Sequence, residues 1–184
     1  MASIMEIREG DLDTPEKRGK YTVSVVGCGR IGLPTACLFA EAGFRVIGVD
    51  SNLKTVNLIR QGRPPFAEPG LEDLLQRHVS NGRLTATTDT CWAASMSDII
   101  TLTLPTPVDE KGKPDYGHVE DACRRVGMGL KPGSLVLLES TIGPGVTETL
   151  VRGVLEEASG LHAGVDFGVA YSPVRASPGR VLRD

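Results

Sequence analysis

The amino-acid sequence predicts an α/β domain with a doubly wound, mainly parallel sheet and helices on both faces. Apolar, β-branched runs alternate with segments of helical spacing, which indicates right-handed β–α–β crossovers. Runs such as SLVLL (134–138) are almost wholly apolar, as expected for strands covered on both faces. Glycine makes up 22 of the 184 residues, about 12% against a usual ~7%, which suits many tight turns. The expected strand order is 3-2-1-4-5-6.

Each element has its own signal in the sequence. The strands are predicted from apolar or β-branched runs at 21–27, 45–50, 83–89, 98–104, 134–139 and 166–172. The helices are predicted from apolar positions at helical spacing at 31–43, 51–62, 71–82, 90–96, 118–130 and 145–160. Pro34 suits the first turn of the first helix, and Gly43 and Gly62 are typical stops. Proline-containing loops are expected at 63–70 and 105–115.

Composition restricts the partners and the compartment. Residues 1–20 form a polar, mixed-charge segment that we expect to be a flexible arm, followed by one domain at 21–184. A net charge of −3 provides no basic surface for nucleic acid or an anionic membrane. The N-terminus has no apolar signal region, and no apolar run approaches the length of a membrane span. These features predict a cytoplasmic protein without a nucleic-acid or membrane partner.

The cysteines and histidines predict neither a disulfide framework nor a metal site. Four cysteines are widely spaced without a C-x-x-C motif, and small buried hydrophobic side chains are the simplest interpretation: Cys28, Cys37, Cys91 and Cys123. Three histidines share no ligand spacing and are expected in surface or capping roles: His78, His118 and His162. A solvated loop is expected for three neighbouring carboxylates: Asp109, Glu110 and Asp115. Trp92 is expected to be a packing residue.

Three glycines lie in VVGCGRIGLP (25–34), where the first strand ends and the first helix begins. Such a G-x-G-x-x-G pattern is weak by itself, because a purely structural turn has the same appearance. Between a strand and a helix, however, Gly27 would permit the turn and Gly29 would let a pyrophosphate approach the backbone. Gly32 would let the helix pack closely. The helix N-terminus adds N–H groups and a partial positive charge for phosphates.

An acidic residue follows at the expected distance. Asp50 ends the second strand, 18 residues after Gly32, where a carboxylate accepts hydrogen bonds from the adenosine ribose. A strand-end cap is the structural alternative. Ser51 follows Asp50 where an arginine would suit a 2′-phosphate, so NAD is favoured over NADP. Strand, glycines, helix, strand and acid together predict a Rossmann dinucleotide site.

Further polar clusters end the other strands. They are Pro105-Thr106-Pro107, Glu139-Ser140-Thr141 and Tyr171-Ser172-Pro173. Because ligands of open α/β sheets bind at the carboxyl ends of the strands, these clusters are expected to line one crevice with the glycine motif. Hydroxyls at Thr106, Ser140 and Thr141 are candidate partners of a pyrophosphate or nicotinamide ribose. Ser140 or Thr141 could instead cap the following helix.

The ordered motifs resemble those of the UDP-glucose/GDP-mannose dehydrogenase family from Tyr21 to the last residue. The resemblance rests on GCGRIGLPTA, FAEPGLEDLL, GRLTATTD, LPTPVDEKGKPD, LESTIGPGVTE and YSPVRASPGR. PPFAEPGL and RASPG are most similar to the branch that oxidises UDP-N-acetylhexosamines such as UDP-N-acetylmannosamine. The resemblance implies NAD-dependent oxidation of the C6 hydroxyl of a UDP-sugar to a carboxylate. Two hydrides pass to two NAD molecules, through an enzyme-bound thiohemiacetal and thioester.

The resemblance also implies roles for individual residues. The cofactor would contact Arg30, Ile31, Asp50, Thr106 and Thr141. Thr141 would in addition position a catalytic water. Arg175 and Ala176 match a segment that touches the UDP-sugar.

Several departures from the family pattern bear on activity. The family's nucleophilic cysteine, its lysine and its asparagine belong to a C-terminal half that is absent here, as is the helix that forms its homodimer. We therefore expect the NAD-binding half of such an enzyme, without turnover alone. Val174 stands where the family has a glutamate linked to hydrolysis, Gly143 replaces a common proline, and Lys54 lies one position early. The alternatives are a β-hydroxyacid-type NAD dehydrogenase and a non-catalytic NAD-binding module.

Overall fold

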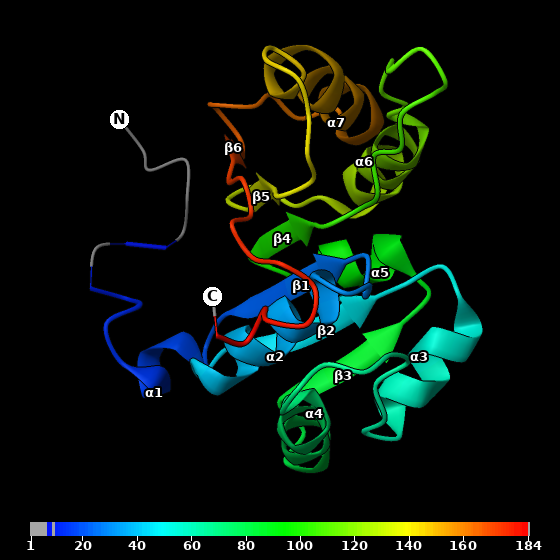
Figure 1. Ribbon diagram of the computed structural model, residues 1–184. Coiled ribbons are helices and arrows are strands. Elements are labelled where there is room, and N and C mark those ends of the chain that lie inside the picture. Colours follow the sequence, from blue (N-terminus) through cyan, green and yellow to red (C-terminus); the bar gives the residue numbers. More distant parts are fainter. Residues whose placement is uncertain (1–6, 9, 184) are drawn as a thin grey trace.

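The computed structural model, which describes residues 7, 8 and 10–183, contains one six-stranded sheet. The strands are β1 (Thr22–Val26), β2 (Arg45–Val49), β3 (Leu84–Thr87), β4 (Ile99–Leu102), β5 (Leu135–Leu138) and β6 (Gly168–Tyr171). Their order is β3-β2-β1-β4-β5-β6, and every neighbouring pair is parallel. The arrowheads of β1, β2 and β3 point the same way in Figure 1. The predicted fold class and strand order are confirmed.

The helices are α1 (Pro15–Arg18), α2 (Gly32–Glu41), α3 (Leu53–Arg60), α4 (Leu71–Ser80), α5 (Thr90–Ser95), α6 (Gly117–Gly129), η1 (Thr147–Val151) and α7 (Arg152–Ser159). The helices that follow β1 alternate with the strands as predicted, whereas α1 precedes β1 in a segment where no helix was predicted. The ends of all predicted strands and helices lie within two residues of the observed ones. The predicted helix at 145–160 begins with a π-helical turn, η1, before it continues as α7.

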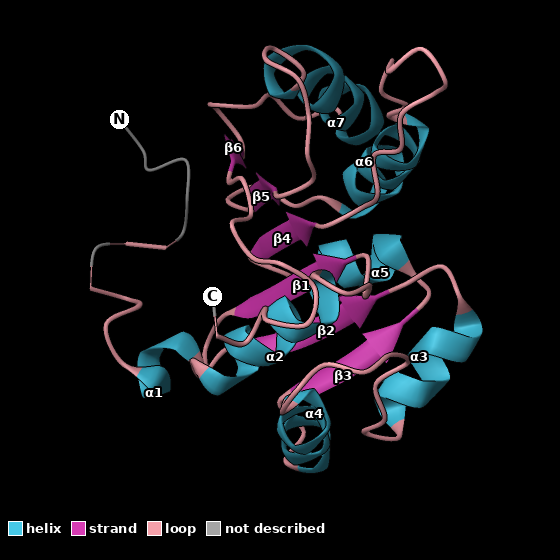
Figure 2. Ribbon diagram, viewed as in Figure 1, coloured by secondary structure: helices cyan, strands magenta, loops and turns pink. Residues whose placement is uncertain are grey.

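Two hydrophobic clusters cover the two faces of the sheet, which Figure 2 shows as a layer between helices. One cluster joins the sheet to α2, α3 and α4, and the other joins it to α5, α6 and α7. β1 contributes Val23 and Val25 to the first cluster and Val26 to the second. Such burial on both faces explains why the central strands are rich in apolar residues.

The arm expected at 1–20 is described only in part, since residues 1–6 and 9 lie outside the described residues. Ile7 and Leu12 pack against the α2-side cluster. Arg18, at the end of α1, donates a hydrogen bond from Nη1 to the Ala42 carbonyl oxygen (2.9 Å). The division at Tyr21 into a flexible arm and a domain stays a prediction.

The segment after β6 returns across the sheet toward α2 (Figure 1). Glu68, from the proline-rich loop at 63–70, is buried and accepts hydrogen bonds from the N–H groups of Gly179 (2.6 Å) and Val181 (3.0 Å). Val181 is itself buried. Glu68 therefore fixes the C-terminal segment beside the loop that precedes α4.

Three side chains differ from the sequence-based prediction: those of His78, of Trp92 and of Cys91, which is partly exposed rather than buried. His78 is 4% exposed, and its Nε2 lies 2.7 Å from Glu41 Oε2 at the end of α2, so its predicted surface or capping role is wrong. The packing of α4 on α2 buries it. Trp92 is 45% exposed because Ala93 and Ala94 turn the other side of α5 toward the sheet. Its predicted packing role is therefore wrong.

Candidate functional site

Two of the three motif glycines are required by the backbone itself. Gly27 has a φ of +98°, and a Cβ there would lie 2.7 Å from the Thr103 carbonyl oxygen. A Cβ on Gly32 would overlap the Gly27 carbonyl oxygen and Thr103 Oγ1. Thr103 Oγ1 donates a hydrogen bond to that same Gly27 oxygen (2.7 Å). Gly27 and Gly32 are therefore explained by close packing, because α2 lies close both to the end of β1 and to the chain after β4.

Gly29 has no such explanation within the protein. Its φ lies outside the left-handed region, and a Cβ there would meet no atom of the described residues within 4 Å. The N-cap residue of α2, Ile31, has no side-chain capping hydrogen bond. An open backbone surface therefore lies beside a helix end whose first N–H groups lack a side-chain cap, an arrangement that suits an anion.

Asp50 connects the end of β2 to the glycine corner. Its Oδ2 accepts a hydrogen bond from Cys28 N (3.1 Å), and its Oδ1 accepts one from Asn52 N (2.9 Å). Asp50 thus has the structural role that the sequence left open. An ionised carboxylate accepts about four hydrogen bonds, so capacity for ligand hydroxyls remains.

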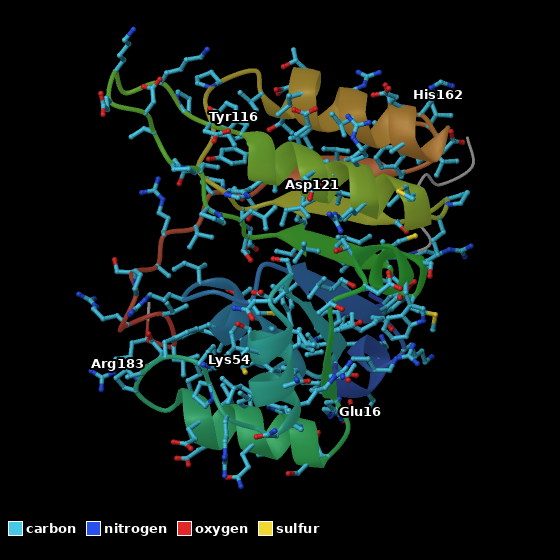
Figure 3. All side chains as sticks on the ribbon, turned by 90° about the vertical axis from the view of Figure 1, so that its right-hand side faces the viewer. Glu16, Lys54, Tyr116, Asp121, His162 and Arg183 are labelled. Atoms are coloured by element: carbon cyan, nitrogen blue, oxygen red, sulfur yellow. The ribbon has the colours of Figure 1, made fainter. Side chains whose placement is uncertain are left out.

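A cleft of about 600 Å³, here called the β2-side cleft, lies beyond Asp50. Its lining residues come from the carboxyl ends of β1, β2, β3 and β4, from the start of α5 and from α6: Val26, Gly27, Gly29, Val49, Asp50, Ser51, Thr88, Thr90, Thr103, Leu104, Pro105, His118, Asp121, Ala122 and Arg125. Figure 3 shows Asp121 on α6. Asp121 Oδ2 accepts a hydrogen bond from Arg125 Nε (3.0 Å). The cleft contains Gly27, Gly29 and Asp50 of the predicted site.

A second cavity of about 310 Å³, here called the β5-side pocket, lies across the segment Thr103–Pro105, which lines both. Its lining residues are Ile31, Thr103, Leu104, Pro105, Thr106, Glu139, Ser140, Thr141, Val174, Ala176 and Pro178. Five of the predicted site residues therefore meet here: Ile31, Thr106, Ser140, Thr141 and Ala176. The β2-side cleft covers the point between β1 and β4 where the strand order reverses, and the β5-side pocket adjoins it at the ends of β4 and β5.

Ser140 already has hydrogen-bond partners within the protein. It is 4% exposed, accepts a hydrogen bond from Leu104 N (2.8 Å) and donates one to the Leu102 carbonyl oxygen (3.4 Å). Its hydroxyl holds the end of β4, so the alternative prediction that Ser140 caps the next helix is wrong. That helix begins only at Thr147. Thr141 is exposed and caps no helix either.

The remaining predicted residues lie at the margins of the two cavities. Gly32 is buried and lines neither cavity. The Arg30 guanidinium lies over the Phe66 ring, 5.8 Å from its centroid. Arg175 lines a shallow depression formed by residues 173–177, next to the β5-side pocket that Val174 and Ala176 line.

Glu139 lines the β5-side pocket. The sequence placed it in a polar cluster expected at the crevice but assigned it no role of its own. Glu139 Oε2 is buried and has no hydrogen-bond partner among residues 7, 8 and 10–183. Burial raises the pKa of this carboxyl from 4.5 to about 7. The sequence signal that could have identified Glu139 is a carboxylate directly after an apolar strand. Its desolvation, however, depends on residues of the segments 103–106 and 174–178, which also line the pocket.

Glu139 is expected to make stability pH-dependent. Because its folded-state pKa is raised, its contribution is fully present below pH 4.5 and is lost as pH rises through about 7. The loss is about 2 kcal/mol after allowance for partial exposure. Glu139→Gln should therefore raise the free energy of unfolding relative to the wild type at pH 8 and leave it nearly equal at pH 4. Urea unfolding at both pH values tests this, and an equal difference at both would contradict it.

Cys28 lies within the glycine corner but is unsuited to nucleophilic chemistry. It is buried, and burial, with the nearby Asp50 carboxylate, raises the pKa of its thiol. Cys37 and Cys123 are buried as predicted, whereas Cys91 is partly exposed.

Across residues 7, 8 and 10–183, no three His, Cys, Asp or Glu side chains are grouped to hold a metal ion. Within the same ranges, no helix has the length and apolar character needed to cross a bilayer.

Comparisons with known proteins identify the family of the chain. The model of the UDP-glucose/GDP-mannose dehydrogenase family, NAD binding domain, matches residues 21–184. GDP-mannose 6-dehydrogenase from Pseudomonas putida is 37% identical over 165 residues, 88% of this chain and 38% of the relative. UDP-N-acetyl-D-mannosamine dehydrogenase from Pyrococcus horikoshii is 38% identical over 162 residues, with the same coverage of 88% and 38%.

The solved structures extend the similarity to three dimensions. The crystal structure of a ternary complex of GDP-mannose dehydrogenase from Pseudomonas aeruginosa has a TM-score of 0.85 at 36% identity, and covers 88% of this chain and 38% of its own. The chain thus spans about 38% of the length of the relatives that it matches. It belongs to the UDP-glucose/GDP-mannose dehydrogenase family, and the part of that family to which it corresponds is the NAD binding domain.

Proposed function

We propose that this chain binds NAD across the β2-side cleft and the β5-side pocket, as the cofactor-binding part of a nucleotide-sugar 6-dehydrogenase. The observation that carries the proposal is Gly29, whose missing side chain leaves open space beside the α2 N-terminus. Packing within the protein gives no reason for a glycine there, whereas close approach of a pyrophosphate does. NAD would supply a hydride acceptor.

Each part of the cofactor has candidate partners in this chain. The backbone at Gly29, together with Arg30 and Ile31, would bind the pyrophosphate, and Asp50 would accept hydrogen bonds from the adenosine ribose. The nicotinamide half would enter the β5-side pocket, where Thr106 and Thr141 offer hydroxyl groups. Ser140 would contribute less directly, because its hydroxyl already bonds to the backbone of 102–104.

The substrate proposal rests on the family and on the names of the relatives, which include dehydrogenases of GDP-mannose and of UDP-N-acetyl-D-mannosamine. We propose a nucleotide sugar, with a UDP-sugar as the first candidate, that is oxidised at C6 to a carboxylate. Arg175 and Ala176 would contact it, and Thr141 would position the water. The complete enzyme is proposed to be a cytoplasmic homodimer.

The chain by itself is proposed to bind cofactor without turnover. Three of its four cysteines are buried and so cannot readily form a thioester with substrate. A non-catalytic NAD-binding module is the second candidate, and Val174 in place of the family's glutamate favours it. A β-hydroxyacid-type dehydrogenase is disfavoured, because the family model matches 164 consecutive positions, 21–184. Turnover of UDP-sugars by the 184-residue chain would contradict the proposal of cofactor binding alone.

Asp50→Ala is expected to weaken NAD binding by about 2 kcal/mol, roughly 30-fold, because hydrogen bonds to a charged acceptor are lost. Calorimetric titration of both proteins with NAD measures the effect. Asp13→Ala, which removes an exposed carboxylate from the segment before α1, is the matched control and should bind as the wild type does. Equal affinities for the Asp50 variant and the wild type would remove Asp50 from the site.

A further inference from the structure

The β5-side pocket contains an ionisable group that the proposed function leaves unused. Of the residues that line this pocket, Glu139 is the one with an ionisable side chain. We propose that the Glu139 carboxylate distinguishes the two redox states of the cofactor, favouring the oxidised form when Glu139 is ionised and losing that preference when it is protonated. The inference rests on the proposed function, since it requires the nicotinamide half to occupy this pocket.

Topology assigns the nicotinamide half to the Glu139 side. A dinucleotide lies across the point where the strand order reverses, with its pyrophosphate at the first helix after β1. Asp50, which suits the adenosine ribose, ends β2 on one side of that point. The other half of the molecule must then extend over the ends of β4 and β5, where the β5-side pocket opens.

The surroundings of Glu139 leave its charge uncompensated. Oε2 is buried and unpartnered, and the neighbouring wall includes Leu104, Pro105 and Val174. Burial therefore raises the pKa of the carboxyl to about 7, with no charged neighbour among the causes. A positive charge brought into this pocket would stabilise the ionised form of Glu139.

The charged and titratable groups on the elements around Glu139 do not line the β5-side pocket. Arg30, from the corner before α2, lies over the Phe66 ring. Arg175 lines the adjoining depression after β6, and Tyr171, which ends β6, is 43% exposed. Tyr116, labelled in Figure 3 at the start of α6, has a hydroxyl that accepts a hydrogen bond from Gly143 N (2.9 Å). β4 and the segment 103–107 contain no ionisable side chain.

The two redox states differ by one charge in the ring. The oxidised nicotinamide ring carries a positive charge and the reduced ring is neutral, so ionised Glu139 attracts the oxidised form alone. An opposite charge at close range shifts a carboxyl pKa by about one unit or more. By linkage, the ratio of the NADH dissociation constant to that of NAD⁺ should rise about tenfold between pH 5.5 and 8.5.

The ratio of the two dissociation constants is insensitive to groups that affect the binding of NAD⁺ and NADH equally. His118 lines the β2-side cleft, and its protonation would affect the binding of NAD⁺ and NADH alike, because both have the same ADP half. A change of the ratio with pH therefore reports on the nicotinamide end. NADH binding alone should follow whatever pH dependence the adenosine side has.

The test is titration of the chain with NAD⁺ and with NADH between pH 5.5 and 8.5. In the wild type, the ratio of the NADH dissociation constant to that of NAD⁺ should rise about tenfold over this range. In Glu139→Gln the ratio should not change with pH. Glu148→Gln should behave as the wild type does. Glu148 is an exposed residue of η1 outside the pocket lining and gives the same change in net charge. Calorimetry of NAD⁺ binding at pH 7 in two buffers of different ionisation enthalpy should show proton release by the wild type and none by Glu139→Gln.

Each outcome has one meaning. A constant ratio in the wild type, or a pH-dependent ratio retained by Glu139→Gln, overturns the role of Glu139 while cofactor binding itself stands. Absence of binding of both forms to the wild type refutes the proposed function instead, and the role of Glu139 with it. Urea unfolding of Glu139→Gln verifies that the variant is folded under the conditions of the titration.

Discussion

Gly32→Ala is expected to destabilise the domain by about 3 kcal/mol. The added Cβ would overlap the Gly27 carbonyl oxygen, which is backbone, and Thr103 Oγ1, which bonds to that oxygen. A flexible side-chain end could turn away, but relief here requires α2 to move from the end of β1. Because α2 packs against both β1 and β2, such a shift would disturb the buried cluster on that face of the sheet.

The midpoint of urea unfolding measures this effect, with Gly153→Ala as the matched control. Gly153 is also helical, in α7, and a Cβ there meets no atom within 4 Å. The control should be stabilised by about 0.5–1 kcal/mol, as is usual when alanine replaces glycine inside a helix. A Gly32 variant as stable as this control would show that the approach of α2 to β1 is less close than described.

Gly29→Val is expected to weaken NAD binding more than 100-fold, by about 2.7 kcal/mol or more, with little change in stability. The space next to Gly29 contains no protein atom within 4 Å of a Cβ, so the folded chain accommodates a side chain. The pyrophosphate proposed to lie there would be displaced from the α2 N-terminus, where the N–H groups favour an anion.

The same titration on Gly153→Val provides the control, since that position is equally open but lies on α7, outside both cavities. Reduced affinity of the Gly29 variant with unchanged unfolding would separate ligand contact from folding. Wild-type affinity of the Gly29 variant would mean that the ligand does not approach this backbone. Gly29 and Gly32 thus have opposite expectations: one substitution impairs binding, and the other impairs folding.

Most of the fold could be predicted because local patterns and the global arrangement agree. Residues 135–138 are all apolar and pack against the hydrophobic clusters on both faces of the sheet, so this run identifies β5 without knowledge of its neighbours. The three glycines, the following helix and Asp50 have a spacing that a dinucleotide-binding corner requires. That the glycine corner binds a dinucleotide stays a prediction.

The incorrect predictions concern side chains whose burial or hydrogen bonding depends on residues distant in the sequence. His78 is buried by α2, and its partner Glu41 lies 37 positions earlier in the sequence. No local pattern predicts that packing. The Ser140 hydroxyl holds the chain at Leu104, 36 positions before it, rather than a helix that follows. The pKa of Glu139 is raised by the burial that a folded pocket provides, which composition cannot reveal.

Titration of the wild-type chain with NADH tests most directly whether the glycine corner binds a dinucleotide. The single tryptophan, Trp92, lies two positions after Thr90, which lines the β2-side cleft. Saturable energy transfer from Trp92 to NADH, with calorimetric heat for one site per chain and weaker binding by Asp50→Ala, is the predicted result. Neither heat nor energy transfer at millimolar NADH would contradict cofactor binding at this corner.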